Sequence, residues 1–526
     1  MSETKNTFLN KTPLFIHTIR EIGCDKMSSL WLDSTNANNN FSSIDKNKKC
    51  DVCIIGAGIT GLSCGYYLSK KGLNVAILDK FDISTKASGN TTAKITYQHN
   101  LIYNYLINSK SQKFALAYLD SNKKAISNIK SIINEEQIDC DFEIESNYVY
   151  TTKQEELPKI HKEIEALYTL GEEVEFVTQS ELPFKIAGAL KNKNQAQFHP
   201  LKYMLGLANC ILKNGGNIYT HTTAYDVKRE NPNYLIYAND YAIQAKYVIT
   251  ASHFPFINFP GFYFSKMYQS TSYIIAVDTH SKLFDGMYIN PTEPIYSFRT
   301  ANYNGKKILL IAGADHKTGY APDLNKSYNL LENEAKKYYP NSEILFRWNT
   351  RDCISLDKIP YIGDFSNLMP NMYVATGFNK WGMTSANIAA NILTDKILGK
   401  ENKYAFVFDS NRLEPIKNSG EIKNIANQVF KSFISNRIKV PEADLEEIKN
   451  DNGGIIKIDS TNVGIYKDTS GNIFAINPTC THLGCLLTWN NLDKTWDCPC
   501  HGSRFNFKGK NIYDPAFKNL EKFEIE

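Results

Sequence analysis

The apolar spacing in the first part of the chain changes twice, which predicts a strand, a helix and a second strand. A continuous apolar run leads into a glycine-rich turn within 51–61, and apolar residues at helical spacing follow as far as Lys70. A second apolar run over 74–78 ends on Asp79. Two short strands around one helix are the pattern of a βαβ unit, so we expect the two strands to lie parallel in one sheet.

Later segments predict further helices and an antiparallel sheet. Apolar residues fall at helical spacing over 112–135, after His199, and over 385–398. Between 268 and 314, short apolar runs alternate with turns, which is typical of antiparallel strands. Short strands are also expected after residue 441. The chain therefore combines an α/β part with antiparallel parts.

Residues 406–440 form a connector with a signal of its own. Ile422, Ile425, Val429 and Phe433 fall at helical spacing, with basic residues distributed around them. A basic amphipathic helix can lie on a membrane surface. Such a helix more often packs on its own protein, which is the interpretation we favour, and peripheral membrane contact stays open as the alternative.

Composition places the chain among ordinary globular proteins and excludes several partners. Its 526 residues are 42% hydrophobic and 22% charged, with a formal net charge of +4. This small charge does not indicate nucleic acid as a partner. No run reaches the ~18 apolar residues of a membrane span. The polar N-terminal tail lacks a secretory signal pattern, so we expect a cytoplasmic protein with no transmembrane segment.

Three glycines and one acid in the βαβ unit supply a candidate dinucleotide site. Gly56 permits the tight turn, Gly58 lets the backbone approach a pyrophosphate, and Gly61 allows close helix packing. The helix N-terminus then faces the phosphates, and Asp79 accepts a hydrogen bond from a ribose hydroxyl. FAD and NAD both use this unit, so these residues by themselves leave the choice between them open.

Four residues near the C-terminus form a candidate metal site. Cys480 and His482 lie on one loop and Cys498 and His501 on another, with 15 residues between His482 and Cys498. Two thiolates and two imidazoles make a metal site by ligand count. Zinc accepts this set, although zinc fingers usually take both cysteines from one loop and both histidines from the other. A zinc site therefore remains the alternative.

The mixed Cys-His pattern resembles the Rieske [2Fe-2S] centre, in which two histidines replace two cysteines on one iron. The resemblance covers about 440–526. It implies that Cys480 and Cys498 hold the inner iron and that His482 and His501 hold the outer, solvent-facing iron.

The same resemblance assigns neighbouring residues. Cys485 and Cys500 match the disulfide that tethers the two cluster loops in Rieske proteins of the quinol-oxidising bc-complex type. Ser503 matches a hydroxyl that donates to a bridging sulfide. Phe505 stands where those proteins carry a tyrosine whose hydroxyl points at a ligand sulfur. Without that donor the reduced cluster is stabilised less, so we expect a potential below the top of the Rieske range.

The rest of the chain, roughly 29–400, is similar to flavoproteins of the D-amino acid oxidase superfamily. The hydroxyl-rich loop at 88–94 resembles the extension that wraps FAD, and 199–251 resembles the return of the chain to the dinucleotide sheet. The turn at 373–384 resembles the one whose backbone amides and helix N-terminus stabilise negative charge on the reduced flavin. The residues that the fingerprint and this resemblance assign to FAD are Gly56, Gly58, Gly61, Asp79, Ser88, Thr91, Thr92, Ala224, Ala251, Gly377, Trp381, Gly382 and Met383.

Together the two resemblances predict the fold class and the domains. We expect an α/β FAD-binding domain of the Rossmann-like, glutathione-reductase type, with an inserted antiparallel-sheet substrate domain and a C-terminal all-β Rieske domain. The expected boundaries are a tail at 1–28, the FAD-dependent oxidoreductase domain at 29–405, the connector helix at 406–440 and the Rieske domain at 441–526.

These two centres predict an FAD-dependent oxidoreductase. By the habit of the superfamily its substrate is an amine or amino acid, and electrons pass singly from FAD to the [2Fe-2S] cluster and then to an external acceptor. Only one dinucleotide fingerprint is found, whereas flavoproteins fed by NAD(P)H often show a second, so we expect electrons to enter from an organic substrate. The alternative is an electron-transfer adaptor that relays electrons between a carrier or quinone and a partner and has no substrate of its own.

Two further residues are candidates for catalysis. Arg299 and His316 fall at the edges of the predicted antiparallel sheet, where either could bind a carboxylate or move a proton. A structural role is more common for a strand-end residue of either type. A third interpretation, a Rieske oxygenase, needs an iron site of two histidines and one carboxylate, and the sequence offers no convincing candidate for one.

Overall fold

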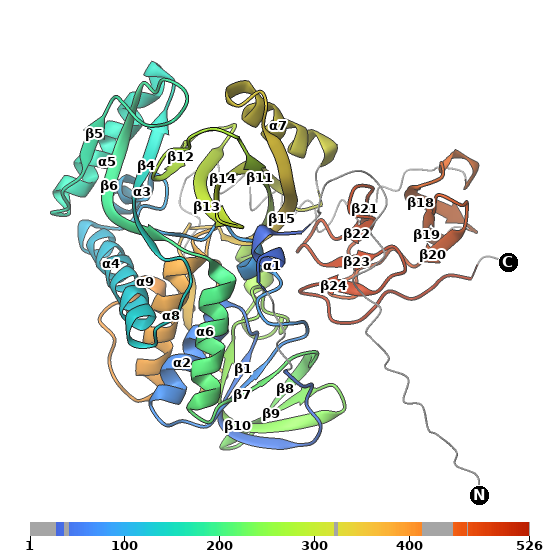
Figure 1. Cartoon of the computed structure of the whole chain (residues 1–526). Coiled ribbons are helices and arrows are strands. Elements are labelled where there is room, and N and C mark those ends of the chain that lie inside the picture. Colours follow the sequence, from blue (N-terminus) through green and yellow to red (C-terminus); the bar gives the residue numbers. More distant parts are fainter. Residues whose placement is uncertain (1–27, 36–40, 320–323, 413–444, 460, 525–526) are drawn as a thin grey trace, which may run out of the picture.

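The computed structural model describes residues 28–35, 41–319, 324–412, 445–459 and 461–524. The described residues up to 412 form the N-terminal unit, and those from 445 form the smaller C-terminal unit that lies against its side (Figure 1). Most of the predicted connector helix and of the N-terminal tail falls outside the described residues.

An eight-stranded sheet forms the first layer of the N-terminal unit. Its strands are β1 (Lys48–Ile55), β2 (Val75–Leu78), β7 (Asn217–Tyr219), β8 (Ala224–Glu230), β9 (Asn233–Ala238), β10 (Tyr241–Thr250), β16 (Tyr361–Asp364) and β17 (Met372–Thr376). They run in the order β16-β17-β10-β1-β2-β7, and the β8–β9 hairpin continues from β10. The pairs that β1 makes with β2 and β10 are parallel, as the βαβ pattern predicts.

Both faces of β1 are covered, which explains its continuous apolar run. Helices α2 (Ile59–Lys70), α6 (Pro200–Lys213) and α8 (Gly382–Ile397) lie together beside this sheet, and α2 contacts the other two (Figure 1). Val52 and Ile54 belong to the core that these helices share. Cys53 and Ile55 belong to the opposite core, which the β8–β9 hairpin completes.

A nine-stranded sheet forms the second layer. Its strands are β3 (Lys94–Ile95), β4 (Glu143–Thr151), β5 (Glu175–Val177), β6 (Gly188–Gln197), β11 (Met267–Asp278), β12 (Met287–Ile289), β13 (Tyr296–Tyr303), β14 (Lys306–Lys317) and β15 (Glu343–Ser355). The order is β15-β11-β14-β13-β12-β4-β6-β3, with β5 beside β6. The strands predicted over 268–314 are antiparallel to one another, as expected. The β12–β4 pair is parallel, a long-range pairing that local patterns do not predict.

The remaining helices are α3 (Ile102–Ser109), α4 (Gln112–Glu135), α5 (Leu157–Thr169) and α7 (Leu324–Tyr338), with the short α1 (Leu30–Asp33) and α9 (Ala405–Phe408). Of these, α5 packs on β4 and β6 and α7 on β11 and β14 of the second sheet, whereas α4 packs on α8 and α9 on β16 of the first layer. The bounds of α4 are those predicted from its apolar spacing. Single turns of 3₁₀ helix occur at η1 (Ala87–Asn90), η2 (Gln154–Glu156), η3 (Tyr263–Ser265) and η4 (Leu445–Glu447). No helix in the described part of the chain is long and apolar enough to cross a bilayer.

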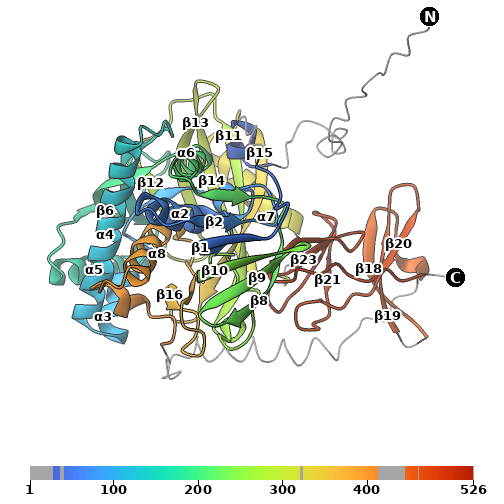
Figure 2. The same cartoon turned by 90° about the horizontal axis from the view of Figure 1, so that it is seen from below.

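The C-terminal unit consists of two small antiparallel sheets (Figure 2). The first contains β18 (Asn452–Ile458), β19 (Thr461–Lys467) and β20 (Ile473–Ile476). The second contains β21 (Thr488–Asn490), β22 (Thr495–Asp497), β23 (Arg504–Asn506) and β24 (Asn511–Tyr513). The second sheet faces the N-terminal unit, and the first lies on its far side (Figure 1). The predicted combination of α/β, antiparallel and all-β parts is confirmed.

Candidate cofactor cavity and cluster site

A cavity of about 880 Å³ in the N-terminal unit collects nearly all of the residues predicted to bind a dinucleotide. Gly61 is the exception. The predicted residues that line the cavity are Gly56, Gly58, Asp79, Ser88, Thr91, Thr92, Ala224, Ala251, Gly377, Trp381, Gly382 and Met383. Segments separated by more than 300 residues in sequence therefore meet around one space.

Gly61 does not line the cavity, but it allows close packing directly behind the cavity wall. A Cβ on Gly61 would lie 1.8 Å from the carbonyl oxygen of Gly56, so only glycine lets α2 approach the turn this closely. Gly56 itself has a φ of +111° and would meet the carbonyl of Ala251 at 2.5 Å if it carried a Cβ. The fingerprint glycines therefore do what the motif predicts: they bring the N-terminus of α2 to the cavity.

Asp79 lies at the end of β2 and accepts two backbone hydrogen bonds. The N–H of Ala57 donates to Oδ2 at 2.7 Å, and the N–H of Phe81 donates to Oδ1 at 2.8 Å. Burial raises the pKa of the Asp79 carboxyl to about 6, and these hydrogen bonds oppose the rise. The Asp79 carboxylate keeps free lone pairs on the cavity wall, so it can accept a hydrogen bond from the expected partner, a ribose hydroxyl.

The hydroxyl-rich loop after β2 is held from behind by two large side chains. The indole N–H of Trp31 donates to the carbonyl of Thr91 at 2.7 Å. The guanidinium of Arg299 donates to the carbonyls of Thr92 at 2.7 Å and Ala93 at 3.1 Å. Arg299 is 3% exposed and is not among the cavity-lining residues. This position differs from that expected of a substrate ligand and gives Arg299 the task of fixing the loop.

His316, the other catalytic candidate, does line the cavity. Its Nδ1 lies 2.8 Å from the carbonyl of Lys317 and therefore carries the proton, so Nε2 accepts from the hydroxyl of Tyr273 at 2.9 Å. Burial lowers the pKa of the imidazole. The ring is therefore neutral, and each of its two nitrogens already has a hydrogen-bond partner.

Charged residues and a histidine that the sequence analysis did not single out lie beside the turn before α8, which contains the predicted Trp381. The ring of His99 stacks on Trp381 with centroids 4.7 Å apart. Lys380 pairs with Asp315 on β14, and both line the cavity together with Asp352. Burial raises the pKa of Asp352 to about 6, which the charge of Lys380 partly offsets. Single acids and lysines at strand ends carry no distinctive sequence signal.

The four predicted metal ligands come together in pairs in the C-terminal unit: the ring centroids of His482 and His501 lie 5.0 Å apart, and the thiols of Cys480 and Cys498 share a hydrogen bond. Cys480 and Cys498 are 2% and 1% exposed. The Nδ1 atoms of His482 and His501 are buried and have no hydrogen-bond partner among the described residues. Burial lowers the pKa of His482 to about 4 and that of His501 to about 3, so both rings are neutral. Two thiols and two free imidazole lone pairs fit a [2Fe-2S] cluster with two Cys and two His ligands.

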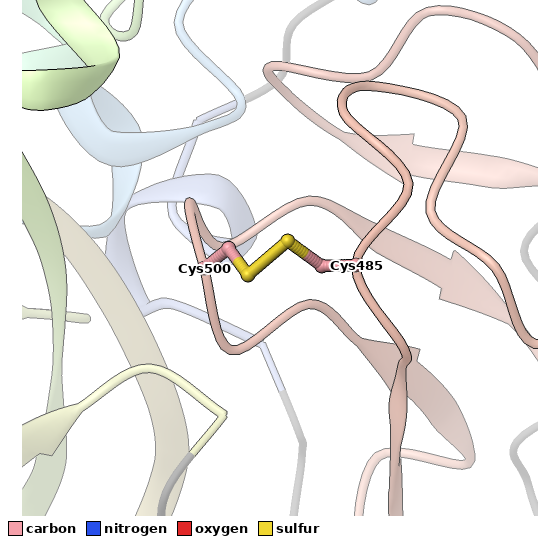
Figure 3. Close-up of a disulfide and its surroundings, with 2 residues drawn as sticks. All are labelled: Cys485 and Cys500. Carbon is pink, nitrogen blue, oxygen red and sulfur yellow. A yellow bond between two sulfur atoms is a disulfide. The ribbon is translucent and has the colours of Figure 1, made fainter. Parts of the chain in front are cut away.

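Further contacts favour the thiolate form of Cys480, which is the form that binds metal, and hold the two cluster loops together. A hydrogen bond with Cys498 lowers the pKa of the Cys480 thiol to about 7, and the N–H of His482 and the hydroxyl of Ser503 act in the same sense. Cys485 and Cys500 form the predicted disulfide, which ties the two loops together (Figure 3). This disulfide removes Cys485 and Cys500 from the set of possible ligands.

His501 does not face solvent and His482 is only partly exposed, which corrects one expectation drawn from the Rieske resemblance. His501 is 2% exposed, and its ring centroid lies 5.9 Å from those of both Phe254 and Phe264. The Nε2 of His482 lies 2.7 Å from Oδ1 of Asn258. All three contacts come from the N-terminal unit. The expectation was wrong because the fold of an isolated cluster domain does not specify which surface the rest of the chain covers.

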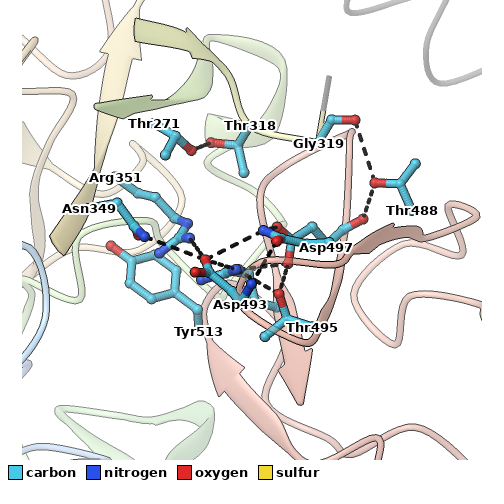
Figure 4. Close-up of polar contacts among 12 residues, drawn as sticks. Thr271, Thr318, Gly319, Asn349, Arg351, Thr488, Asp493, Thr495, Asp497 and Tyr513 are labelled. Atoms are coloured by element: carbon cyan, nitrogen blue, oxygen red, sulfur yellow. Dashed lines mark hydrogen bonds and ion pairs between the residues drawn. The ribbon is translucent and has the colours of Figure 1, made fainter. Parts of the chain in front are cut away.

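A buried polar network joins the two units beside the cluster (Figure 4). Asp493, between β21 and β22, accepts from Arg504 at 2.5 Å and forms an ion pair with Arg351 of β15 at 3.7 Å. Arg504 also donates to Asp497 at 2.6 Å. The guanidinium of Arg351 lies over the ring of Tyr513, 5.1 Å from its centroid. The cluster face is therefore held to the N-terminal unit by charges that are largely shielded from water.

The C-terminal unit also reaches the cofactor cavity. Tyr513 and Asp514 are among its lining residues. Lys80 hydrogen-bonds Asn511 and lies 3.8 Å from the carboxylate of Asp514. Lys86 donates to the carbonyl of Ile512 at 3.2 Å. The sequence contained no signal for this contribution, because it depends on how the two units dock.

Comparisons with known proteins match both units of the chain. A family model described as FAD dependent oxidoreductase matches residues 51–396, and one described as Rieske [2Fe-2S] domain matches residues 439–524. The "Putative Rieske 2Fe-2S iron-sulfur protein YhfW" of Bacillus subtilis (strain 168) is 36% identical over 94% of this chain and 97% of its own length. Gamma-glutamylputrescine oxidoreductase of Escherichia coli (strain K12) is 23% identical over 72% of this chain and 90% of its own. Glycine oxidase from Geobacillus kaustophilus superposes with a TM-score of 0.60 at 18% identity, over 70% of this chain and 100% of that one.

Proposed function

The chain belongs to the FAD dependent oxidoreductase family and carries a C-terminal Rieske [2Fe-2S] domain, and from this premise we propose what it oxidises and where the electrons go. The proposed reaction is the oxidation of a small amine or amino acid at FAD, followed by transfer of single electrons to the cluster of the same chain and then to an external acceptor. FAD supplies the two-electron chemistry, and the cluster exchanges one electron at a time.

The single observation that carries the proposal is a segment that touches both sites. Residues 251–264, here called the bridging segment, follow β10 directly. Ala251 and His253 line the cofactor cavity. Phe254 and Asn258, a few residues further on, contact the histidines of the cluster. One short stretch of backbone therefore connects the cavity wall to the cluster ligands.

The bridging segment is anchored on the cavity side. The hydroxyl of Thr376, at the end of β17, donates to the carbonyl of His253, and the thiol of Cys353 lies 3.5 Å from the same oxygen. Gly377, the next residue after Thr376, begins the turn predicted to face the flavin. The two cofactor sites are thus held at a fixed separation, as transfer within one chain requires.

A carboxylate on the cavity wall, Asp352, offers a partner for a cationic nitrogen in the substrate. Asp352 lies on the cavity wall and is ionised above its pKa of about 6. No arginine is among the described lining residues, so the bidentate carboxylate clamp that arginine provides is not offered here. We therefore assign the ammonium group to Asp352 and any substrate carboxylate to a lysine such as Lys358, which also lines the cavity. The Escherichia coli relative is a gamma-glutamylputrescine oxidoreductase, and an amine of that kind supports the same substrate class.

Anaerobic mixing tests the proposal. Purified protein loaded with both cofactors is mixed with a panel of amines and amino acids, and separately with NAD(P)H. Flavin absorbance is followed against time, and the reduced cluster is followed by low-temperature EPR. An amine that bleaches the flavin, followed by growth of the Rieske signal, is the expected result.

A ligand variant supplies the control. In Cys480→Ser the amine should still bleach the flavin while no Rieske EPR signal grows. If no member of the panel bleaches the flavin, but a reduced carrier or quinol fills both centres of the unmodified protein, the substrate proposal is refuted and the chain is an electron-transfer adaptor.

A further inference from the structure

A side chain of the bridging segment forms a hydrogen bond with Nε2 of His482, one of the predicted cluster ligands. The Nε2 of His482 lies 2.7 Å from the side-chain Oδ1 of Asn258, while Nδ1 of the same ring is buried and has no hydrogen-bond partner among the described residues. We propose that Asn258 is a positioning residue for the cluster: it holds His482 in the tautomer and orientation that bind iron through Nδ1, and it lowers the reduction potential of the cluster.

The tautomer follows from hydrogen-bond chemistry. A neutral imidazole carries one N–H and one lone pair, and iron must take the lone pair. A carbonyl oxygen can only accept, so Asn258 requires the proton on Nε2 of His482 and leaves the lone pair on Nδ1. An amide N–H₂ in the same place would require the opposite tautomer and would block iron. With its carbonyl oxygen toward the ring, as it lies here, Asn258 stabilises the form of His482 that binds metal.

The effect on the potential has a definite sign. A carbonyl that accepts from the N–H of a ligating imidazole makes the ring a stronger electron donor, and this favours the more positive, oxidised iron. Burial acts in the same direction. Phe254 and Phe264 shield the neighbouring His501 from water, and reduction adds a negative charge to a cluster in this less polar environment.

Asn258 is well placed for this task because its own backbone is held. Its carbonyl accepts from the N–H of Phe262 at 2.9 Å, which closes the loop before η3. The other cluster histidine, His501, has a backbone hydrogen bond with Phe264 instead. A backbone carbonyl cannot be removed by substitution, so Asn258 is the position at which the ligand contact can be changed by mutation.

Two substitutions in the full-length holoprotein test the proposal. Asn258→Leu removes the acceptor and keeps a similar volume, so the potential should rise. Asn258→Asp keeps the acceptor and adds a negative charge next to the cluster, so the potential should fall below that of the unmodified protein. Asn108→Leu is the matched control, because the Asn108 side chain bonds to Asn104 within α3, away from the cluster.

The readouts are the midpoint potential from a mediated redox titration followed by EPR, and the iron content per chain. Neither uses an organic substrate, so the result is independent of the proposed amine oxidation. Iron loss in Asn258→Leu together with retention in Asn258→Asp also supports the positioning role. The proposal is overturned if both variants keep their iron and the potential of the control, or if both lose iron, since aspartate still supplies an acceptor.

Discussion

Asp493 is predicted to hold the cluster unit in place, and its removal tests whether the buried network does so. The side chains of its two cationic partners, Arg351 and Arg504, are only 7% and 6% exposed. Asp493→Ala leaves these cations in a poorly hydrated environment with one carboxylate fewer. Removing one partner of a buried ion pair typically costs about 3–5 kcal/mol, because the remaining charge stays desolvated.

For Asp493→Ala we expect a cost at the lower end of this range of about 3–5 kcal/mol. Arg504 keeps a second carboxylate, Asp497, at 2.6 Å, and the side chain of Asp493 itself is 16% exposed. We therefore expect the opening free energy of the region around β21 and β22 to fall by about 3 kcal/mol. Since 1.4 kcal/mol is a factor of ten, amides there should exchange roughly a hundredfold faster.

Hydrogen exchange followed by mass spectrometry on the holoprotein measures this change without unfolding the cluster. Asp451→Ala is the control in the same unit. Its carboxylate pairs with Lys494 at 2.9 Å, but the two side chains are 48% and 28% exposed. Such a pair contributes at most about 1 kcal/mol. If Asp493→Ala accelerates exchange around β21 and β22 no more than Asp451→Ala does, the reasoning about the buried network is refuted.

Three further predictions concern the two cofactor sites. Gly61→Ala places a Cβ 1.8 Å from the carbonyl oxygen of Gly56, so α2 must shift at a cost of about 1–3 kcal/mol or more, and the flavin content per chain should drop sharply. Gly454→Ala, where the nearest atom would lie at 3.8 Å, should keep full flavin, and equal flavin in the two variants would contradict this prediction. Phe505→Tyr adds a hydroxyl in the core that contains the cluster cysteines, and by the Rieske resemblance a donor to a ligand sulfur should raise the potential in a redox titration; an unchanged or lower potential would count against that role. Because the pKa of Asp352 is raised to about 6, its carboxyl is protonated below pH 6 and ionised above it, so KM for an amine should rise by roughly tenfold per unit as the pH falls below 6. Asp352→Asn should show a high KM at every pH, and a pH profile like that of the unmodified protein would remove Asp352 from the substrate site.

Local sequence was sufficient wherever function depends on short-range geometry. The fingerprint around Gly56 and Gly61 could be read directly, because the contact between them arises within one turn of chain. The same holds for α4, whose bounds follow from apolar spacing over 112–135. The cluster ligands could be predicted because each loop supplies its pair within four residues, and the spacing itself constrains the metal geometry.

Residues with several plausible roles could not be assigned in this way. Arg299 could have bound a substrate, and only the structure shows that it donates to the carbonyls of Thr92 and Ala93. An arginine on a strand has the same local pattern in either role. Its partners lie more than 200 residues away, so apolar spacing contains no information about them.

The amino-acid sequence by itself determined the cofactor motifs, the fold class and most elements, because these follow from local spacing and apolar periodicity. Only the tertiary structure decided how the two units face one another. Asn258 meets His482 across 224 residues, and Lys80 meets Asn511 across 431. Such contacts depend on which surfaces become buried when two folded units dock, and that choice depends on the summed shape and charge of many distant residues. For the same reason, a cluster edge expected to face solvent lies against the flavin-binding part of its own chain.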